Sequence, residues 1–446
     1  MRAEPTGPPA AGGGSQGTPV RDRPHDVSVL NGAIAALLES PSKVPRKSLE
    51  GPCHRASVNV MVTRSALLRS RSAVATVFVI NGALFASWTA HIPAVKARIG
   101  ADDGDLGMAL VGAPVGSVAA ILASAFLIRR FGSARVLRTA LVGYTVTGLL
   151  VGQARSLVEL AGALALWGAF LGLLDIAMNT QAVAVEQLLD RQIMTGLHGS
   201  WSIGAFAGAG LGALGVAAGL SLTGQLLILG TIGLVVGLVA ATCLVPDPVP
   251  RSRVDQGPRV RRLDRAVIVL GVIAAASMLC EGAAADWSAV YLRGSTHASA
   301  GAAGLGYAAF ALAMVAIRFG GGRLLARFPT DRLLPTLAAA AVVGVGLALL
   351  VGEFVVAVLG FAMLGAGLGL VVPAVFSACG RLPGVNPGTA IATASGFGWV
   401  GFVAGPPVIG QLAGAVTLPV ALGLVPLLLA GVAVGVWRNR AMAVGR

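Results

Sequence analysis

The chain has 446 residues, of which 55% are hydrophobic and only 12% charged, and its formal net charge is +14. Soluble domains carry about 25% charged residues, so this composition excludes a soluble protein of ordinary surface polarity. Apolar stretches recur along the sequence, which excludes a single soluble domain with one membrane anchor. We also expect no nucleic-acid partner, because the arginines fall in short loops between these stretches rather than in one basic domain.

Residues 1–70 differ from the rest of the chain. The run MRAEPTGPPAAGGGSQGTP is rich in proline and glycine and cannot bury a core. The apolar stretch 27–38 is shorter than the ~20 residues that a spanning helix needs, and charged residues and Pro41 interrupt any signal-peptide core. We therefore predict that residues 1–70 are a disordered, dispensable tail, with Met61 as an alternative start of translation.

From residue 72 onward, apolar segments follow one another with short breaks. Each is long enough for a helix across ~30 Å of hydrocarbon at ~1.5 Å per residue. Helices are expected because a bilayer offers an open backbone no hydrogen-bond partners. We predict an all-α membrane protein with twelve transmembrane helices, at 72–95, 106–128, 136–152, 157–185, 196–219, 222–245, 266–292, 300–320, 333–351, 354–378, 389–414 and 418–437.

The distribution of basic residues predicts the orientation. With the N-terminus inside, the cytoplasmic loops and C-terminal tail hold eighteen arginines, whereas the opposite loops hold four basic residues, Lys96, Arg98, Arg155 and Arg293. Cytoplasmic loops of membrane proteins carry the excess of Lys and Arg. We therefore expect a multi-pass protein of the bacterial inner membrane, with both termini, the linker 246–265 and the tail 439–446 in the cytoplasm.

The two halves of the chain are related in sequence. Asn81-Gly-Ala and Trp88 match Glu281-Gly-Ala and Trp287, and Trp201 matches Trp399, all at offsets of 197 to 200 residues. A repeat of six spans in the same order gives both halves the same topology, so the repeats are parallel. We predict two six-helix bundles, residues 71–245 and 266–438.

Twelve spans, a basic central loop and a parallel six-plus-six repeat resemble the major facilitator superfamily. The family signature G-x-x-x-[DE]-R-x-G-[RK]-[RK] between spans two and three is partly present: Arg130 and Gly132 match it, and Arg129 replaces the acid. A second copy keeps Arg327, also without an acid. The resemblance implies a monomeric secondary transporter, not an enzyme, with these three residues in gating loops and two bundles that rock around a midplane site.

Within that superfamily, the fourth span resembles the fucose-permease-like branch. The branch carries an acid in an L-E-x-x-x-N-P-Y setting, and here Asp175 falls on the acid and Asn179 on the asparagine, while Thr180-Gln181 replaces Pro-Tyr. The fifth span, with His198 and Trp201, begins similarly. The resemblance implies transport of a sugar-like solute.

Asp175 is the only charge in the interior of the fourth span. A carboxylate at membrane depth costs a few kcal/mol and usually faces a partner, a cavity or a proton path. We predict that Asp175, with Glu281 in the seventh span, couples protons to transport; the alternative is a structural aspartate tied to neighbouring helices. Asp286 points away from Glu281 on the helix, and Arg318 could bind Glu281, bind an anionic solute or extend to the inner interface.

Polar and aromatic side chains recur at helical spacing in the spans. Rings with hydrogen-bonding edges suit sugars and other amphipathic solutes, although tryptophan also anchors helices at the interface. His91 shares a face with Trp88 in the first span and could sense pH. The predicted solute-binding residues are Asn81, Trp88, Asn179, His198, Trp201, Trp287 and Trp399.

The sequence predicts no metal site and no cofactor. The four cysteines are scattered without CxxC or metal-ligand spacing, and the glycine-rich spans contain no GxxxxGK[ST] phosphate loop. We predict proton-driven uptake of a small sugar-like solute. Two alternatives stay open: efflux of a drug or metabolite, which the absence of proline from 204–215 disfavours, and a membrane sensor or scaffold that transports nothing.

Overall fold

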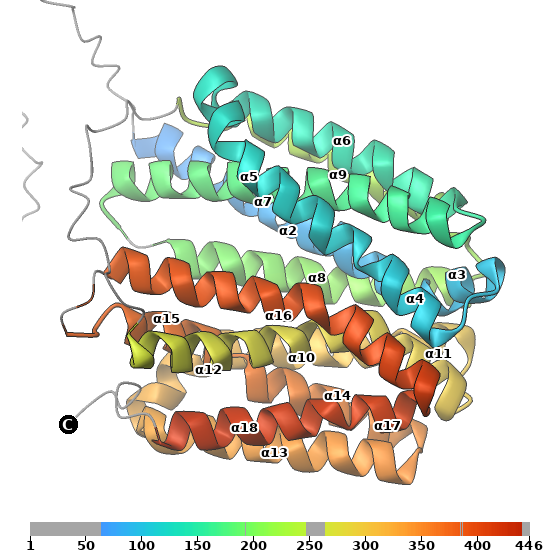
Figure 1. Cartoon of the computed structure of the whole chain (residues 1–446). Helices are drawn as coiled ribbons and strands as arrows, with labels where there is room; N and C mark the ends of the chain where they lie inside the picture. The colour runs from blue at the N-terminus through green and yellow to red at the C-terminus, as the bar shows by residue number, and fades with distance from the viewer. Residues whose placement is uncertain (1–63, 192, 247–263, 384, 386, 439–446) are drawn as a thin grey trace, which may run out of the picture. The chain divides into compact units, whose positions relative to one another are not determined.

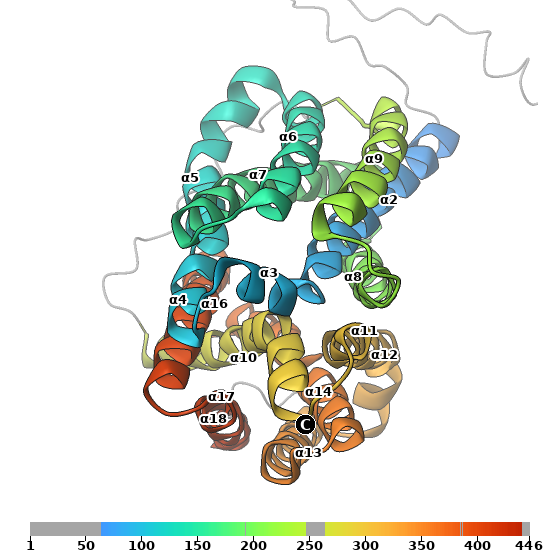
Figure 2. The same cartoon turned by 90° about the vertical axis from the view of Figure 1, so that its right-hand side faces the viewer.

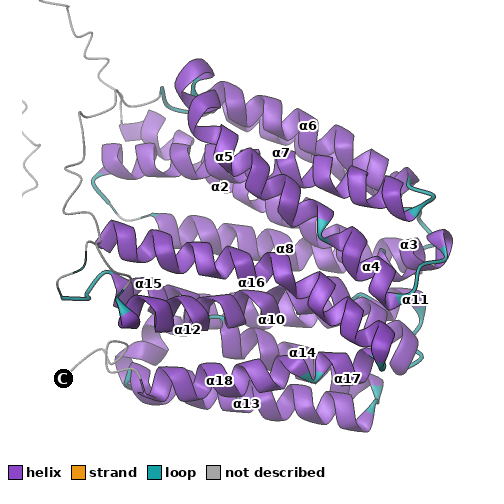
Figure 3. Ribbon diagram, viewed as in Figure 1, coloured by secondary structure: helices purple, strands orange, loops and turns teal. Residues whose placement is uncertain are grey.

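The structure, a computed structural model, describes residues 64–191, 193–246, 264–383, 385 and 387–438. All of them belong to one unit of the chain, Met61–Arg446. The predicted tail up to residue 63, most of the linker and the C-terminal residues 439–446 lie outside the described residues. Helices make up nearly all of this part of the chain, and within it no strand occurs (Figure 3).

The helices follow the predicted segments, several of which are divided in two. The elements of the N-terminal half are α2 (Arg64–Thr89), α3 (Ile92–Ile99), α4 (Asp103–Leu110), α5 (Gly112–Phe131), α6 (Ser133–Gln153), α7 (Leu157–Leu189), α8 (Met194–Ala217), α9 (Leu222–Ala240) and the 3-10 turn η1 (Ala241–Cys243). Those of the C-terminal half are α10 (Arg265–Ser295), α11 (Ala300–Ala303), α12 (Leu305–Arg327), α13 (Thr330–Val351), α14 (Phe354–Leu368), α15 (Val371–Cys379), α16 (Pro387–Ala415), α17 (Leu418–Leu422) and α18 (Leu424–Arg438).

Helix α2 begins at Arg64, so the prediction of disorder is wrong for residues 64–70. Leu67 is buried in the core, and the Ser70 hydroxyl donates to the carbonyl oxygens of Ala66 (3.0 Å) and Cys243 (2.6 Å). These contacts tie the first two turns of α2 to the end of the sixth span. Seven residues that looked like tail are therefore part of the helix.

Eleven helical segments of the described residues are long and apolar enough to cross a membrane. The remaining predicted span forms α16, which has 29 residues and no charged side chain, but whose glycines, hydroxyl residues and prolines lower its hydropathy. It packs along α10 and α4, so protein neighbours cover much of its surface. Large apolar side chains such as Val158 and Leu350, 82% and 85% exposed, face outward elsewhere, as expected of a surface that meets lipid.

The sequence repeat is also a repeat of helix packing. Gly168 on α7 lies against the backbone of Ala113 on α5, and Gly365 on α14 lies against the backbone of Phe310 on α12. Both residues of the second pair lie 197 positions after those of the first. Likewise, α2 packs along α8 and α10 along α16, in each case at close distance over glycines.

The two halves meet at the end of the helices that carries α3, α4 and α11, the predicted outer end (Figures 1 and 2). There, a Cβ atom at Gly107 of α4 would lie 2.8 Å from the Gly410 Cα of α16, and one at Gly304 would lie 2.8 Å from the Ala213 Cβ of α8. Gly304 follows Gly107 by 197 residues, and Gly410 follows Ala213 by 197. The contact is thus built twice, each time with one residue from each half.

The halves separate toward the opposite, predicted inner end on one side of the protein. Helix α5 continues from α4 but runs away from α16, as Figure 1 shows, and the two helices make few contacts. On the other side, α8 and α12 stay together along their lengths. The halves are therefore in close contact at the predicted outer end, whereas toward the inner end α8 and α12 stay together but α5 and α16 do not.

Candidate functional site

Asp175 lies near the middle of α7, and the other charges of this helix, Glu159 and Glu186, lie near its two ends. The Asp175 side chain is half-buried. The Asn179 amide donates to the Asp175 side-chain oxygen Oδ1 (3.2 Å) and to its carbonyl oxygen (2.9 Å). No cation pairs with this carboxylate, since the one ion pair among the described residues joins Lys96 and Asp103. Asp175 is thus an interior carboxylate whose side-chain partner is a neutral amide.

A second polar group lies on the neighbouring helices. The Trp201 ring nitrogen Nε1 on α8 donates to the Asn81 oxygen Oδ1 on α2 at 3.2 Å, and the Asn81 nitrogen lies 3.8 Å from the Met178 sulfur on α7. Met178 and Asn179 follow Asp175 by three and four residues, so they share its side of α7. The structure therefore brings three predicted residues, Asn81, Asn179 and Trp201, close to the predicted acid.

Trp88 and His91 lie apart from this group. Trp88 is 3% exposed and packs edge to face on Trp167, which in turn stacks on Tyr144. The Gln225 amide donates to the Ser87 carbonyl (3.0 Å), which orients its oxygen toward the His91 nitrogen Nε2 at 2.9 Å. Both residues serve packing at the predicted outer end in this conformation.

His91 lies in the turn after the first span ends at Thr89. Burial of the imidazole lowers its pKa from the ordinary value of 6.5, and the hydrogen bond from His91 Nε2 to the Gln225 oxygen offsets only part of this effect. The neutral form is therefore the one that the fold stabilises.

His198 and Arg318 lie nearer the predicted inner end. The His198 ring is exposed and meets Phe78 edge to face at 5.4 Å. From α12, the Arg318 nitrogen Nη1 donates to the Ser202 hydroxyl of α8 at 2.8 Å. Arg318 therefore contacts the other half of the protein and does not extend to the inner interface.

The predicted residues of the C-terminal half form no comparable network. Glu281 and Asp286 on α10 are half-buried, and neither forms a hydrogen bond or ion pair with any described residue. Trp287 is fully buried and its ring nitrogen has no partner within the described part of the chain. Trp399 on α16 is partly exposed and packs edge to face on Phe402. The C-terminal half thus contributes two acids without partners.

With this geometry in place, comparisons with known proteins decide the family. The profile of the Major Facilitator Superfamily matches residues 73–406. The chain belongs to the major facilitator superfamily. It is similar to an uncharacterised transporter of this type from Yersinia pestis (33% identity, 80% of this chain, 92% of the relative) and to an uncharacterised transporter of Sinorhizobium fredii (32% identity, 82% and 97%). The protein is therefore a multi-pass membrane transporter of this superfamily rather than an enzyme.

Solved structures support the same fold at low sequence identity. A mutant form of the nucleoside transporter NupG superposes with a TM-score of 0.65, at 15% identity, over 83% of this chain and 99% of that one. A D-xylose-proton symporter superposes with a TM-score of 0.64, at 14% identity, over 83% and 98%. The fucose-permease-like branch stays a prediction.

The loop between the second and third spans carries part of the superfamily signature, and Gly132 ends α5 there. Gly132 has φ +83°, a conformation that side chains disfavour, and its N–H bonds to the Ile128 carbonyl at 2.8 Å, which ends α5. The Arg130 guanidinium lies 5.5 Å from the Phe131 ring centre. Arg327 is the last residue of α12. The gating role of these residues stays a prediction.

Gln181 is a polar residue that the sequence analysis did not single out. It is fully buried on α7; its Nε2 donates to the Ser133 hydroxyl (2.7 Å) and the Val245 carbonyl (3.0 Å), and its Oε1 accepts from the Val245 N–H (3.1 Å). These bonds join the inner ends of three spans. A polar amide inside a long membrane span, next to Asn179 and Thr180, was the available signal.

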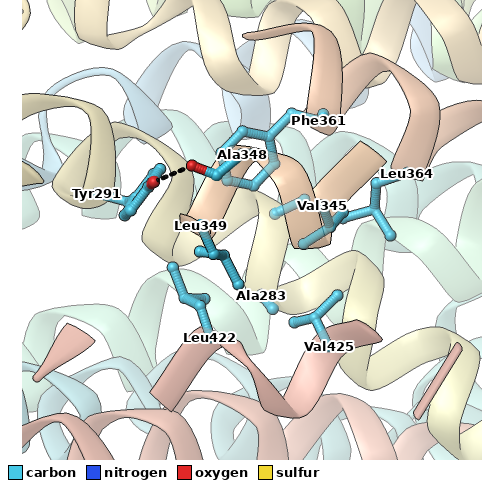
Figure 4. A pocket seen from close by; sticks show the side chains of 11 residues that line it. Ala283, Tyr291, Val345, Ala348, Leu349, Phe361, Leu364, Leu422 and Val425 are labelled. Carbon is cyan, nitrogen blue, oxygen red and sulfur yellow. Dashed lines mark hydrogen bonds between the residues drawn. The ribbon is translucent and has the colours of Figure 1, made fainter. Parts of the chain in front are cut away.

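The described cavities lie away from Asp175. One, between α10, α13, α14 and the last span, is lined by apolar side chains, and the Tyr291 hydroxyl beside it already donates to the Ala348 carbonyl at 2.6 Å (Figure 4). Another lies between α6 and α7 near Gln153 and Glu159. Within the described residues no group of His, Cys, Asp or Glu could hold a metal ion. The described residues that line the first cavity offer no free polar group to a polar solute, and the second cavity, beside Gln153 and Glu159, lies at the predicted outer ends of α6 and α7, apart from the candidate site residues.

Proposed function

We propose that this superfamily member is a monomeric, proton-coupled transporter that takes up a small sugar-like solute across the bacterial inner membrane. In this proposal, residues 71–245 and 266–438 move as two bundles joined by the cytoplasmic linker 246–265, and both termini are cytoplasmic. The solute binds between the bundles, and a proton carried by Asp175 drives the cycle.

The observation that carries the proposal is the setting of Asp175. It is the interior charge of a span, it is half-buried, and its side-chain partner is the neutral Asn179 amide. A carboxylate without a counter-ion at membrane depth is costly, and protonation removes that cost. The charge of Asp175 can therefore change with the side of the membrane to which it is open. A structural aspartate would instead be expected to pair with a cation or several donors.

The neighbouring polar groups suit a hydroxylated solute. Asn179 and Trp201 are partly exposed near Asp175, and the buried Asn81 holds the Trp201 ring by accepting from its nitrogen. The partly exposed Trp399 adds an aromatic surface from the other half. Such mixed polar and aromatic walls orient small ligands. The D-xylose-proton symporter and the nucleoside transporter among the solved structures of this fold are consistent with this class of solute.

The contact at the predicted outer end is where the two halves would separate during transport. It is formed by small residues, Gly107 against Gly410 and Gly304 against Ala213, so no large side chains must repack when it opens. In the proposal, the described conformation exposes Asp175 to the cytoplasm, and separation of this contact exposes it to the outside.

The test is transport by purified protein in proteoliposomes, after a thermal-shift screen of sugars and nucleosides has identified a solute. Asp175→Asn keeps the size and some hydrogen bonding but cannot titrate. We expect it to lose uptake driven by a pH gradient to background while retaining solute exchange. Asp190→Asn, at the exposed end of the same helix, is the matched control and should transport normally.

Two outcomes would contradict the assignment. Full gradient-driven uptake by Asp175→Asn would transfer the coupling role to Glu281, the second predicted acid, and Glu281→Gln would then be the variant that loses coupled uptake. Loss of binding and folding together would favour a structural aspartate. Uptake of no tested solute by a well-folded protein would favour the sensor or scaffold alternative.

A further inference from the structure

Arg318 is the charge in the interior of α12. It lies nine residues before the helix end at Arg327, about 13 Å along the axis. Its guanidinium is half-buried and donates to Ser202, which is itself 2% exposed and donates to the His198 carbonyl at 3.2 Å. Arg318 is thus held between the two halves at Ser202, the residue that follows Trp201 on α8.

The charge of Arg318 is uncompensated in this conformation. A guanidinium has five N–H donors in a planar fork, and among the described residues Arg318 has one hydrogen-bond acceptor, the neutral Ser202 hydroxyl. It forms no ion pair within 4.0 Å, although Glu281 and Asp286 on α10 lie within electrostatic range of Tyr307, as Arg318 does. Buried charges are normally paired. The remaining donors are therefore available to a ligand.

His198 adds a second group to this position. Its ring is exposed, it interacts electrostatically with Arg318, and it lies one turn before Ser202 on α8. Arginine, serine and imidazole donors from two helices form the arrangement that binds planar oxyanions, because the guanidinium fork matches two carboxylate oxygens.

We propose that Arg318, with Ser202 and His198, binds the carboxylate of the transported solute, which is a small polyhydroxylated acid such as a sugar acid. The inference rests on the proposed function and narrows its solute class. A monoanion fits better than a phosphate dianion, because Arg318 is the one arginine here and Glu281 and Asp286 make the surroundings less positive. The hydroxyl groups of the solute would meet Trp201, which is next to Ser202 on α8, and, beyond it, Asn81 and Asn179.

An acidic solute also explains why its uptake would be coupled to a proton. An anion enters a cell against the interior-negative membrane potential. A proton carried on Asp175 cancels the charge of one carboxylate, so that uptake becomes electroneutral and depends on the pH gradient rather than on the potential.

The experiment compares matched pairs of solutes, D-glucuronate with D-glucose and D-galacturonate with D-galactose, as ligands of the purified full-length protein. Thermal shift and equilibrium binding are measured for the wild type, Arg318→Gln, Arg318→Lys and Ser202→Ala. Arg323→Gln, an exposed arginine of the same helix, is the matched control. Circular dichroism and gel filtration check that each variant is folded.

We expect the wild type to bind at least one acid about tenfold or more tightly than its neutral counterpart. Arg318→Gln should lose the preference for the acid while keeping the weak affinity for the neutral sugar. Arg318→Lys and Ser202→Ala should each keep part of that preference, and Arg323→Gln should keep all of it. If Arg318→Gln does not fold, Arg318→Lys is the deciding variant. Lysine cannot form the bidentate fork, so an unchanged affinity of Arg318→Lys for the acid would overturn the inference.

Equal or tighter binding of the neutral sugar, no binding of either acid, or an unchanged preference in Arg318→Gln would also overturn it. The outcome separates the two proposals. Coupled uptake of a neutral sugar that depends on Asp175 refutes the acid site and keeps the proposed function. Binding of an acid through Arg318 without any uptake keeps the site and refutes the function.

Discussion

The two ends of the contact between the halves are built differently. At the predicted outer end, backbones approach closely at Gly107 and Gly410 and again at the repeat-related Gly304 and Ala213, and the Gln411 amide donates to the Gly104 carbonyl at 3.3 Å. Toward the inner end, α5 departs from α16, whereas α8 and α12 stay packed together; among the described residues, one side-chain hydrogen bond, from Arg318 to Ser202, joins this pair.

This difference explains how the outer contact can keep the two halves closed in one conformation and separate in another. Packing of small residues excludes water and lipid at short range, yet it contains few interlocked side chains, so separation costs little repacking. The inner end lacks this packing between α5 and α16, and Asp175 is partly exposed in the described conformation.

The largest effect should follow from filling the outer contact. A Cβ atom at Gly107 would lie 2.6 Å from the Pro406 carbonyl oxygen, so Gly107→Leu prevents closure. We expect transport to fall to background while the folded protein stays open to the outside, measured by uptake and by labelling of an outward-facing cysteine. Gly162→Leu, where no atom lies within 4 Å, is the control. Normal uptake by Gly107→Leu would show that the contact need not close.

A moderate effect should follow from weakening the same contact. Gln411→Ala removes the side-chain bond to Gly104 but fills no space. One net hydrogen bond contributes ~0.5–1.5 kcal/mol, which shifts the ratio of the two conformations by roughly two- to tenfold. We expect an outward-facing cysteine to be labelled faster from outside, and the rate of uptake to change. No change in labelling would mean that the glycine packing alone sets the equilibrium.

The smallest effect concerns pH at the outer end. Because burial lowers the pKa of His91 below 6.5, the unfolded chain takes up a proton before the folded protein does as the pH falls. The free energy of unfolding should therefore decrease as the pH falls below about 6.5, and stay constant above it as far as His91 is concerned. His91→Gln should show less of this decrease, measured by thermal unfolding in detergent at a series of pH values. An identical pH profile for both proteins would contradict this account of His91.

Sequence reasoning predicted the spans and the repeat because both depend on hydrophobicity and spacing. It also singled out Asp175, since a charge inside an apolar span is visible without a structure. It placed the start of the first helix wrongly, because the anchoring bond of Ser70 goes to Cys243, far along the chain. The burial of Trp88 on Trp167 and the bond from Arg318 to Ser202 likewise depend on tertiary packing, which residue spacing does not encode.

The most direct test of the account is a reversible lock on the outer contact. A Cβ atom at Gly414 would lie 3.7 Å from the Gly104 Cα, so Gly104→Cys and Gly414→Cys are close enough for a disulfide, in a background whose four native cysteines are replaced. We predict that oxidation of the double variant abolishes uptake in proteoliposomes, that reduction restores it, and that neither single variant responds. Undiminished uptake by fully cross-linked protein would contradict the claim that the solute passes by separation of the two halves at this end.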